Sequence, residues 1–335
     1  MPTADTRPIA FPVPADLREA TCCLTLLAGA GTRWVKTLAA AKAAGAKGQE
    51  VDRFPLEAPR GLFPVRNFIN DKTPRIPLAA YAVDAFRGLG RQLLVVRGWE
   101  EEIRSEILEA LDIGSGEVGF CTQELGPGGK ALGHGDAARQ ARPFWRDSTY
   151  VLTNFGGDAN SPLTARASLN ALASLNAAGE DVGLLLPVAE AENPAYPVIL
   201  DAEGIPRAFG HNKLGGAGQA GWGGAIVSAN LAYTNVGIRA YRTEALLAAI
   251  HEIESKYWRE DSGYSIPGND PESHEFALDN VDALLASRGK ARILAIAKPE
   301  ELTPAKSFDE IGRFEAAAEK VRAAWRHFVS AGDSQ

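Results

Sequence analysis

The sequence predicts an α/β domain built on a mostly parallel sheet with helices on both faces. Short apolar runs typical of buried strands alternate with helical patterns of about a dozen residues between positions 20 and 188, as in parallel sheets. The first run, at 20–28, leads into the glycine-rich loop Gly29-Ala30-Gly31. With 335 residues, of which 45% are hydrophobic and 23% charged, the chain can form one large domain.

The first half of the chain contains the alternating elements. Each expected strand is a short apolar run, and each expected helix has apolar residues at helical spacing before a glycine or a polar turn. We expect strands at 20–28, 93–96, 119–122, 150–155 and 182–188, and helices at 36–50, 77–90, 100–111, 136–144 and 162–177. Ligands of such sheets bind beyond the carboxyl ends of the strands, so the loop at 29–33 and Asp158, which follows the fourth strand, are expected to share one cleft.

The pattern changes beyond residue 190. A strand with a hairpin turn at 197–204 and a glycine-rich segment at 214–224 predict a small substrate-side β lobe at about 190–270. Apolar residues on one face of the last helix predict that it packs as a cap. The remaining expected elements are helices at 243–256, 275–287 and 307–330 and a strand at 291–297, within an N-terminal extension at 1–19, a main domain at 20–300 and a C-terminal helical cap at 301–335.

Composition excludes several classes of function. The net charge is −7 and no run of Lys and Arg is long enough to follow a phosphate backbone, so nucleic acid is not an expected partner. The three cysteines include the adjacent pair Cys22 and Cys23, which in a strand would point to opposite faces and form neither a disulfide framework nor a metal site. The sequence lacks a secretory signal pattern and a membrane-spanning apolar run, so we expect a cytoplasmic protein that does not bind membranes.

The loop after the first strand indicates phosphate binding. Its two glycines allow backbone N–H groups to approach phosphate oxygens, and Arg33 adds a charged fork. The loop lacks the third glycine of a dinucleotide-binding fingerprint and the Gly-Lys-Ser/Thr of a P-loop. A glycine-rich turn without function is the alternative. The candidate nucleotide-binding residues here are Ala28, Gly29, Ala30, Gly31 and Thr32.

Several segments resemble the sugar-phosphate nucleotidyltransferases, and in particular the branch of UDP-glucose and UDP-N-acetylglucosamine pyrophosphorylases. They follow the family's order from residue 26 to residue 311. The matching segments are Leu26-Leu27-Ala28-Gly29-Ala30-Gly31-Thr32-Arg33, Pro59-Arg60-Gly61-Leu62-Phe63-Pro64-Val65, Gly133-His134-Gly135-Asp136, Asn235-Val236-Gly237-Ile238, Leu278-Asp279-Asn280-Val281 and Pro304-Ala305-Lys306-Ser307-Phe308-Asp309-Glu310-Ile311.

The resemblance implies a Rossmann-like sheet of the glycosyltransferase-A type. It also implies the transfer of a nucleotidyl group to a sugar 1-phosphate with release of pyrophosphate, assisted by Mg²⁺, with UTP as the expected nucleotide. Guanylyl or adenylyl transfer to an unusual sugar or cyclitol phosphate remains open, and so does assembly as a homo-oligomer. A nucleotide-sugar binding or regulatory protein without catalysis is a second hypothesis, and a dehydrogenase is a third that the missing glycine disfavours.

The resemblance also assigns roles to individual residues. Arg33, Arg60 and Lys306 would act on the phosphates, and Asp158 would bind Mg²⁺ through its carboxylate. Arg60 stands where the family has a lysine, with Lys36 as the alternative candidate, and Lys306 stands where many bacterial members have a metal-binding asparagine. Further candidates are Gln123, Gly133, His134 and Gly135 for the nucleotide, and Lys213, Asn235 and Gly237 for the sugar.

His134 can be interpreted in two ways. It could be a general base, or its flanking glycines, Gly133 and Gly135, could make room for a base or a sugar. Because the attacking sugar phosphate is already an anion, phosphoryl-type transfer needs little proton chemistry, which favours the second interpretation. Gln123 and Lys213 could equally be exposed polar residues without a role.

Overall fold

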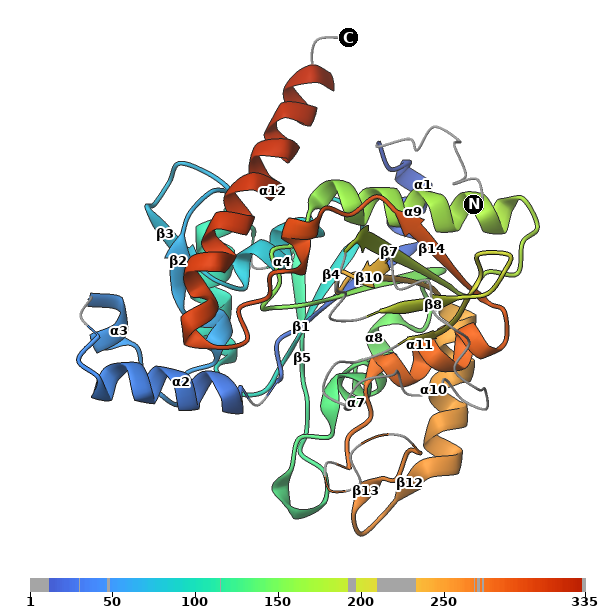
Figure 1. The fold of residues 1–335 in the computed structure, drawn as a ribbon, viewed down its shortest axis with the longest axis horizontal. Helices are drawn as coiled ribbons and strands as arrows, with labels where there is room; N and C mark the ends of the chain where they lie inside the picture. The colour runs from blue at the N-terminus through green and yellow to red at the C-terminus, as the bar shows by residue number, and fades with distance from the viewer. Residues whose placement is uncertain are drawn as a thin grey trace.

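The computed structural model describes residues 12–29, 31–46, 49–114, 116–191, 197–209, 233–267, 269, 272 and 274–332. Within these ranges an eight-stranded sheet forms the centre of the molecule (Figure 1). Its strands are β1 (Thr21–Leu26), β4 (Arg91–Val96), β5 (Val118–Thr122), β6 (Tyr150–Phe155), β7 (Leu184–Glu190), β10 (Tyr233–Asn235), β11 (Arg239–Arg242) and β14 (Ala291–Ala295).

The sheet is mostly parallel, as the alternation of strands and helices predicts. β1 pairs in parallel with β4 and with β6, β4 pairs in parallel with β5, and β7 pairs in parallel with β14. β10 and β11 are antiparallel to their neighbours. The chain moves outward from β1 to β4 and β5 and then returns to β6 on the other side of β1. The order therefore reverses between β1 and β6, and the crevice beyond their carboxyl ends is where ligands bind in such sheets.

Helices cover both faces of the sheet (Figure 1). On one face α7, α8, α10 and α11 pack on the core that contains Cys22, and on the other α9 packs on the core that contains Cys23. The two cysteines thus point to opposite faces, as expected, and burial raises the pKa of each thiol. The helices are α1 (Ala15–Glu19), α2 (Thr32–Ala43), α3 (Gln49–Arg53), α4 (Ala80–Ala85), α5 (Glu100–Ile103), α6 (Glu109–Leu111), α7 (Gly133–Gln140), α8 (Arg142–Trp145), α9 (Pro162–Ala177), α10 (Thr243–Tyr257), α11 (Leu278–Ser287) and α12 (Ile311–Gly332).

In the part of the chain that the structure describes, three small antiparallel pairs lie outside the main sheet. They are β2 (Pro64–Arg66) with β3 (Arg75–Pro77), β8 (Val198–Leu200) with β9 (Pro206–Phe209), and β12 (Trp258–Arg259) with β13 (Gly263–Tyr264). The hairpin predicted at 197–204 corresponds to β8 and the turn before β9. The glycine-rich segment at 214–224 lies outside the described residues.

Several expected helices differ from the structure. The helix predicted at 77–90 is confined to α4, and the helix predicted at 136–144 begins earlier, at Gly133, and is divided into α7 and α8. The helix predicted at 36–50 begins earlier, at Thr32, because Gly31 in a left-handed conformation (φ 62°) turns the chain directly into it, and it ends at Ala43, before Gly45. The helix predicted at 100–111 is interrupted by a π-helical segment, Arg104–Leu108, between α5 and α6. The helix at 162–177 has the predicted bounds.

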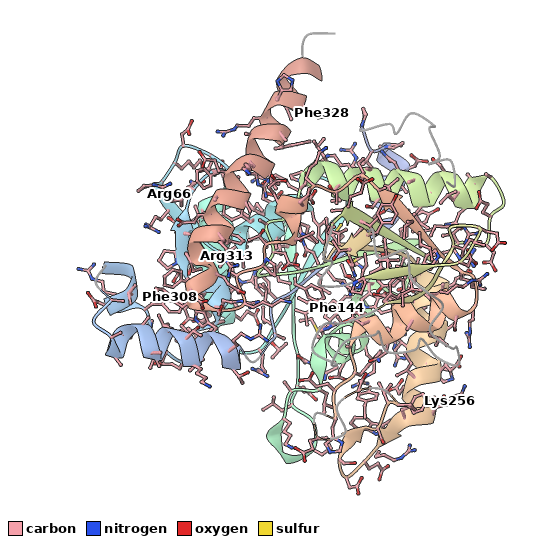
Figure 2. All side chains as sticks on the ribbon, viewed as in Figure 1. Arg66, Phe144, Lys256, Phe308, Arg313 and Phe328 are labelled. Atoms are coloured by element: carbon pink, nitrogen blue, oxygen red, sulfur yellow. The ribbon has the colours of Figure 1, made fainter. Side chains whose placement is uncertain are left out.

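The C-terminal helix α12 packs against a third core, formed around α2, α4 and the β2–β3 pair, through residues such as Phe314. Arg322, only 1% exposed, donates to the Asp84 carboxylate and to the Tyr81 carbonyl and so joins α12 to α4. Phe308 precedes α12 (Figure 2). Its ring contacts that of Trp34 in α2. The C-terminal end of α12, which bears Phe328, extends away from the sheet (Figures 1 and 2).

Candidate functional site

The glycine-rich loop forms the entrance to a helix. Ala28 is buried directly after β1, and Gly31 is the N-terminal cap residue of α2. The first N–H groups of a helix have no acceptor within the helix, and together with the helix dipole they form an anion-binding site. Thr32 and Arg33 are exposed in the first turn. The geometry suits a phosphate group; Ala30 lies outside the described residues.

Asp158 lies beyond the carboxyl end of β6, beside the strand that carries this loop. It is 8% exposed, and a Cβ added to Gly237 would lie 2.3 Å from its Oδ2 atom, so its carboxylate rests on the turn between β10 and β11. Burial raises the pKa of Asp158 to about 6, and the positive charges of Lys306, Arg60 and Arg239 oppose that shift. Three cations from three separate segments therefore surround one buried carboxylate.

Arg60 lies in the short 3-10 helix η1 (Arg60–Leu62), and its guanidinium packs closely against Gly157. A Cβ on Gly157 would lie 2.5 Å from Nη2, 2.8 Å from Cζ and 3.2 Å from Nε of Arg60. Burial lowers the pKa of Arg60, the carboxylates of Asp158 and Glu310 raise it, and Arg33 lowers it further. Arg33, Arg60 and Asp158 thus belong to one electrostatic cluster, whereas Lys36 is exposed on α2.

Lys306 reaches the site because the segment before α12 is tied to the loop after β6. The Ala305 N–H donates to the Gly157 carbonyl at 2.9 Å. The Glu310 carboxylate accepts from the Lys306 N–H at 2.7 Å and the Ser307 N–H at 2.9 Å. We call Arg33, Arg60 and Lys306 the cationic cluster. Arg33 lies in the first turn of α2, Arg60 in η1 and Lys306 in the segment before α12. The charges of Arg60 and Lys306 lower the pKa of Asp158, and that of Arg33 lowers the pKa of Arg60.

The segment predicted to contact a sugar forms the turn between β10 and β11. The Asn235 Oδ1 atom accepts from the Gly237 N–H at 2.8 Å, and the buried Asn160 donates to the Val236 carbonyl at 3.1 Å. Asn235 is half-buried and Gly237, with φ 88°, contacts Asp158. The structure therefore places Asn235 and Gly237 beside the carboxylate. Lys213 lies outside the described residues.

Arg239 is a buried residue of the site that the sequence interpretation missed. It is 2% exposed and donates from Nε to Asp282 at 2.6 Å, from Nη2 to Asp279 at 2.7 Å and from Nη1 to the Gly237 carbonyl at 3.2 Å. Burial opposes the charge of Arg239, but the carboxylates of Asp282 and Asp279 outweigh it and raise the pKa of the guanidinium. Arg239 thus fixes the turn next to Asp158. The one feature of the sequence that could have identified Arg239 as a site residue is its position directly after the Asn235–Ile238 motif.

The structure of the Gly133-His134-Gly135-Asp136 motif differs from the interpretation that its glycines make room for a base or a sugar. A Cβ on Gly133 would lie 2.6 Å from the Phe276 carbonyl oxygen, and one on Gly135 would lie 2.8 Å from the Ala277 carbonyl carbon. The segment before α11 fills the space, so the glycines do not make room for a base or a sugar there. The His134 Nδ1 atom accepts from the Leu278 N–H at 3.0 Å, which leaves Nε2 3.6 Å from Asp279. His134 therefore holds α11 in place.

Gln123 follows β5, at the same edge of the sheet, and is 3% exposed. Its Nε2 atom donates to the Gly133 carbonyl and to the Asp136 carboxylate, at 3.1 Å in each case. Both hydrogens of the amide are therefore used within the protein. No donor among the described residues reaches its Oε1 atom, which is the group that remains to accept a hydrogen bond from a ligand.

A magnesium ion would find one protein carboxylate here. In the described parts of the chain no group of three or more His, Cys, Asp and Glu side chains could hold a metal. Protein-bound Mg²⁺ keeps several waters and is often held by one or two carboxylates together with substrate phosphates. The arrangement around Asp158 fits an ion that arrives with a triphosphate, because the phosphate oxygens would supply the missing ligands and offset the surrounding cations.

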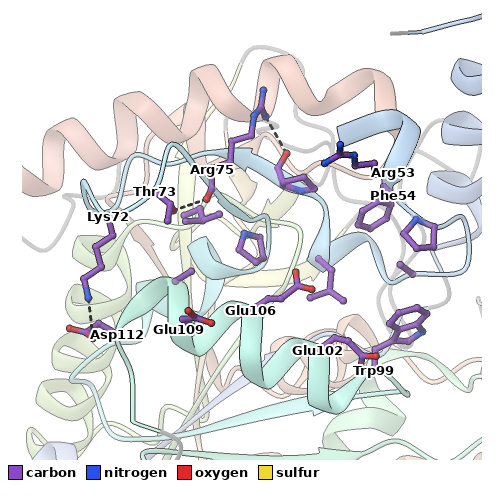
Figure 3. A pocket seen from close by; sticks show the side chains of 17 residues that line it. Arg53, Phe54, Lys72, Thr73, Arg75, Trp99, Glu102, Glu106, Glu109 and Asp112 are labelled. Atoms are coloured by element: carbon purple, nitrogen blue, oxygen red, sulfur yellow. Dashed lines mark hydrogen bonds and ion pairs between the residues drawn. The ribbon is translucent and has the colours of Figure 1, made fainter. Parts of the chain in front are cut away.

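A separate cavity of about 870 Å³ lies between the β2–β3 pair and the helical segment from α5 to α6 (Figure 3). One wall carries the carboxylates of Glu102, Glu106 and Glu109, and Phe54 and Trp99 lie at one end. Burial and the neighbouring Glu102 raise the pKa of Glu106. Arg53, Lys72 and Arg75 also line the cavity, so its charge is mixed, in contrast to the cationic cluster.

No helix in the described ranges is long and apolar enough to cross a membrane.

No family model matches the sequence, and no curated protein matches it. Among solved structures, the fold is similar to that of a Bacillus anthracis protein assigned as a glucose-1-phosphate thymidylyltransferase, crystallised with sucrose. The match has a TM-score of 0.56 and 12% identity and covers 89% of this chain and 95% of the other. The chain therefore has the Rossmann-like nucleotidyltransferase fold that the sequence predicts.

Proposed function

We propose that this protein is an enzyme that transfers a nucleotidyl group from a nucleoside triphosphate to a sugar 1-phosphate and releases pyrophosphate. The observation that carries the proposal is the position of Arg60 and Lys306 beside Asp158, with Arg33 next to Arg60, at the point where the strand order reverses. A cationic cluster beside a helix N-terminus is suited to a triphosphate. The fold that the chain shares with a protein assigned as a sugar-phosphate thymidylyltransferase supports the same reaction class.

The resemblance to the UDP-sugar branch supports UTP as the nucleotide, and the orientation of Gln123 is compatible with it. Because its amide N–H groups are bound to Asp136 and Gly133, Gln123 can only accept a hydrogen bond from a base. Uracil, thymine and guanine can donate to it from a ring N–H, and cytosine and adenine can donate from an exocyclic amino group, so this acceptor does not by itself exclude a base.

The mechanism follows from the positions of the charges. A phosphate oxygen of the sugar 1-phosphate attacks the α-phosphorus in line, and pyrophosphate leaves from the opposite side. The N-terminus of α2 and Arg33 hold the triphosphate, while Arg60 and Lys306 offset the charge that develops on the phosphates. Asn235 and Gly237 contact the sugar. Positioning and electrostatics carry the reaction, and no covalent enzyme intermediate forms.

Asp158 would hold a magnesium ion that arrives with the nucleotide and would supply positive charge at the α-phosphate. Gly237 presses against one face of its carboxylate, which restricts the directions from which a ligand can approach. Arg60 replaces the family's lysine directly: its planar guanidinium lies on Gly157 and can bind two phosphate oxygens at once.

The proposal is tested by pyrophosphate release with Mg²⁺ from four nucleoside triphosphates and a panel of sugar 1-phosphates, beside Asp158→Ala. Release with UTP and one sugar 1-phosphate that is lost in the variant would support it and identify the sugar. Binding of a nucleotide sugar without release from any pair would favour a binding or regulatory protein instead. Release with GTP only would retain the reaction class and replace the nucleotide.

A further inference from the structure

A buried polar contact joins β11 to α11 next to the candidate site. Arg239 and Tyr241 are two positions apart on the strand, so their side chains project from the same face. Asp279 and Asp282 are three positions apart on the helix, so they also lie on one face. Tyr241 Oη donates to Oδ1 of Asp282, and Arg239 Nε donates to Oδ2 of the same carboxylate at 2.6 Å. Nη2 of Arg239 donates to Asp279 at 2.7 Å, so donors of the strand meet acceptors of the helix.

This contact fixes the direction of the Arg239 guanidinium. Arg239 is 2% exposed and Asp282 is 1% exposed, and removing two charges from water costs about as much free energy as their attraction returns. Apolar side chains of similar size often join two elements equally well. The charged groups add direction, because the planar guanidinium donates from a rigid fork. It cannot rotate without breaking its bonds to Asp282 and Asp279.

The same guanidinium binds the turn between β10 and β11. Its Nη1 atom donates to the Gly237 carbonyl at 3.2 Å. Asn160, which is 0% exposed and lies two residues after Asp158, donates to the Val236 carbonyl at 3.1 Å. Buried side chains from two different segments therefore hold two successive carbonyls of the turn. Through Arg239, one of these bonds connects the turn to α11.

The turn in turn limits the movement of the Asp158 carboxylate. A Cβ added to Gly237 would lie 2.3 Å from Oδ2 of Asp158, so the carboxylate packs directly against the turn. In the described part of the chain no residue donates a hydrogen bond to this carboxylate or forms an ion pair with it within 4.0 Å. Its orientation therefore depends on packing, and the position of Gly237 is part of that packing.

We propose that Arg239 is a positioning residue: it holds the turn at 235–238 in place from α11, and the turn holds the Asp158 carboxylate beside the cationic cluster. Arg239 does not bind phosphate itself, because it is buried and its donors are engaged by two carboxylates and the Gly237 carbonyl. The inference rests on the proposed function, which makes Asp158 part of the transfer site. It gives α11 a role in that site although no residue of this helix belongs to the cationic cluster.

Arg239→Lys tests the support of the turn without reference to catalysis. Lysine keeps the charge that Asp282 and Asp279 require, but its single ammonium nitrogen replaces the fork that also reaches the Gly237 carbonyl. The Gly237 N–H donates to Asn235 Oδ1 in the parent protein. Without substrate or metal, this N–H should exchange with solvent about 5-fold to 10-fold faster in the variant, because the turn opens more often. The amides of β1 should exchange at the parent rate, and NMR-detected hydrogen exchange measures both.

Arg242→Lys is the matched control. Arg242 ends the same strand and pairs at 2.7 Å with Asp181, whose side chain is 60% exposed. The same substitution there should change neither the exchange of the Gly237 N–H nor the rate of transfer.

The rate of pyrophosphate release tests the role in transfer. In Arg239→Lys, kcat expressed per nucleotide-binding site should fall about 10-fold to 100-fold, because a misplaced carboxylate reduces the rate. The KM for the nucleotide should stay within about twofold of the parent value, since the N-terminus of α2 and Arg33 hold the nucleotide. A residue that only stabilises the fold would lower the number of binding sites and leave kcat per site unchanged.

Unchanged exchange of the Gly237 N–H in a folded Arg239→Lys variant would overturn the inference, and so would faster exchange with an unchanged kcat. If the variant does not fold, Asp279→Ala takes its place. That substitution removes the acceptor of Nη2 and keeps Asp282, so it should change the exchange and kcat in the same directions, and unchanged values would overturn the inference. Absence of pyrophosphate release in the parent protein would reject the proposed transfer alone, and the exchange of the Gly237 N–H would still decide whether Arg239 holds the turn.

Discussion

Gly157→Ala displaces Arg60 without changing any charge. Gly157 adopts backbone angles that alanine can also adopt, since it is not among the residues with positive φ. The new Cβ atom would lie 2.5 Å from Nη2 and 2.8 Å from Cζ of Arg60, whereas ordinary contacts begin at 3.4 Å. The guanidinium must therefore move by about 1 Å, and a misplacement of that size can reduce the rate about 100-fold. We expect a loss of that order in kcat, with a small change in KM.

The assay is pyrophosphate release at saturating substrates, with Gly312→Ala as the control. Gly312 lies on α12, where a Cβ would meet nothing within 4 Å, so its replacement should leave the rate unchanged and raise the free energy of unfolding by about 0.5–1 kcal/mol. Arg60→Ala should reduce kcat about 100-fold to 1,000-fold, as the loss of one group that stabilises developing charge does.

The combination of Gly157→Ala with Arg60→Ala tests the route of the effect. If Gly157→Ala acts by displacing the guanidinium, the double variant should be no slower than Arg60→Ala, because the displaced group is absent. A further 100-fold loss in the double variant would refute the reasoning, since alanine would then harm the site by another path. A rate within about twofold of the parent in Gly157→Ala alone would show that Arg60 is not required in its observed position.

Two predictions concern stability. Asp158→Asn removes a buried carboxyl group, and burial raises the pKa of that group from 3.8 to about 6. A raised pKa means that the carboxyl group contributes stability below its unfolded-state pKa and that this contribution is lost as pH rises through 6. In urea titrations without divalent metal, the variant should be more stable than the parent at pH 8 but not at pH 4. The difference in the free energy of unfolding should be a few kcal/mol at most, since each unit of pKa shift corresponds to about 1.4 kcal/mol. Equal stability at pH 8 would contradict the burial of Asp158. Arg322→Met leaves the Asp84 carboxylate buried without its main partner and should reduce the free energy of unfolding by about 3–5 kcal/mol, whereas Arg313→Met on an exposed face of α12 should change it by less than about 0.5 kcal/mol. Similar urea midpoints for the two variants would show that the Arg322 pair does not anchor the helix.

The sheet could be predicted because its signals are local. An apolar run, a glycine-rich loop and a polar residue at the end of a strand each depend on neighbours in sequence, and parallel strands place all such ends at one edge. This is why the sequence predicts that Gly31 and Asp158, which lie far apart in the chain, share one crevice. The beginning of α2 was misplaced because the helix starts at the left-handed Gly31 rather than at the alanine-rich segment that follows.

Pairs of buried charges have no such local signal. Arg239 and Asp282 are separated by 43 residues, and each looks like an ordinary surface residue of a strand or a helix until the fold places α11 beside β11. The glycines next to His134 were misinterpreted for the same reason: the space that they leave is filled by Phe276 and Ala277, which only the tertiary structure places there. The residue types indicate that these positions are constrained, but they do not indicate which neighbouring residues constrain them.

The difference between local sequence signals and tertiary contacts also matters for the motif around Asp136. A sequence match can mark a motif as part of a nucleotide site without separating the residue that contacts the ligand from those that hold it in place. In this structure the histidine and both glycines are occupied by the segment before α11, and the aspartate is occupied by Gln123, Gln140 and Arg139. The motif therefore holds neighbouring segments of the protein in place. Substitutions within it should reduce stability before they change the rate of transfer itself.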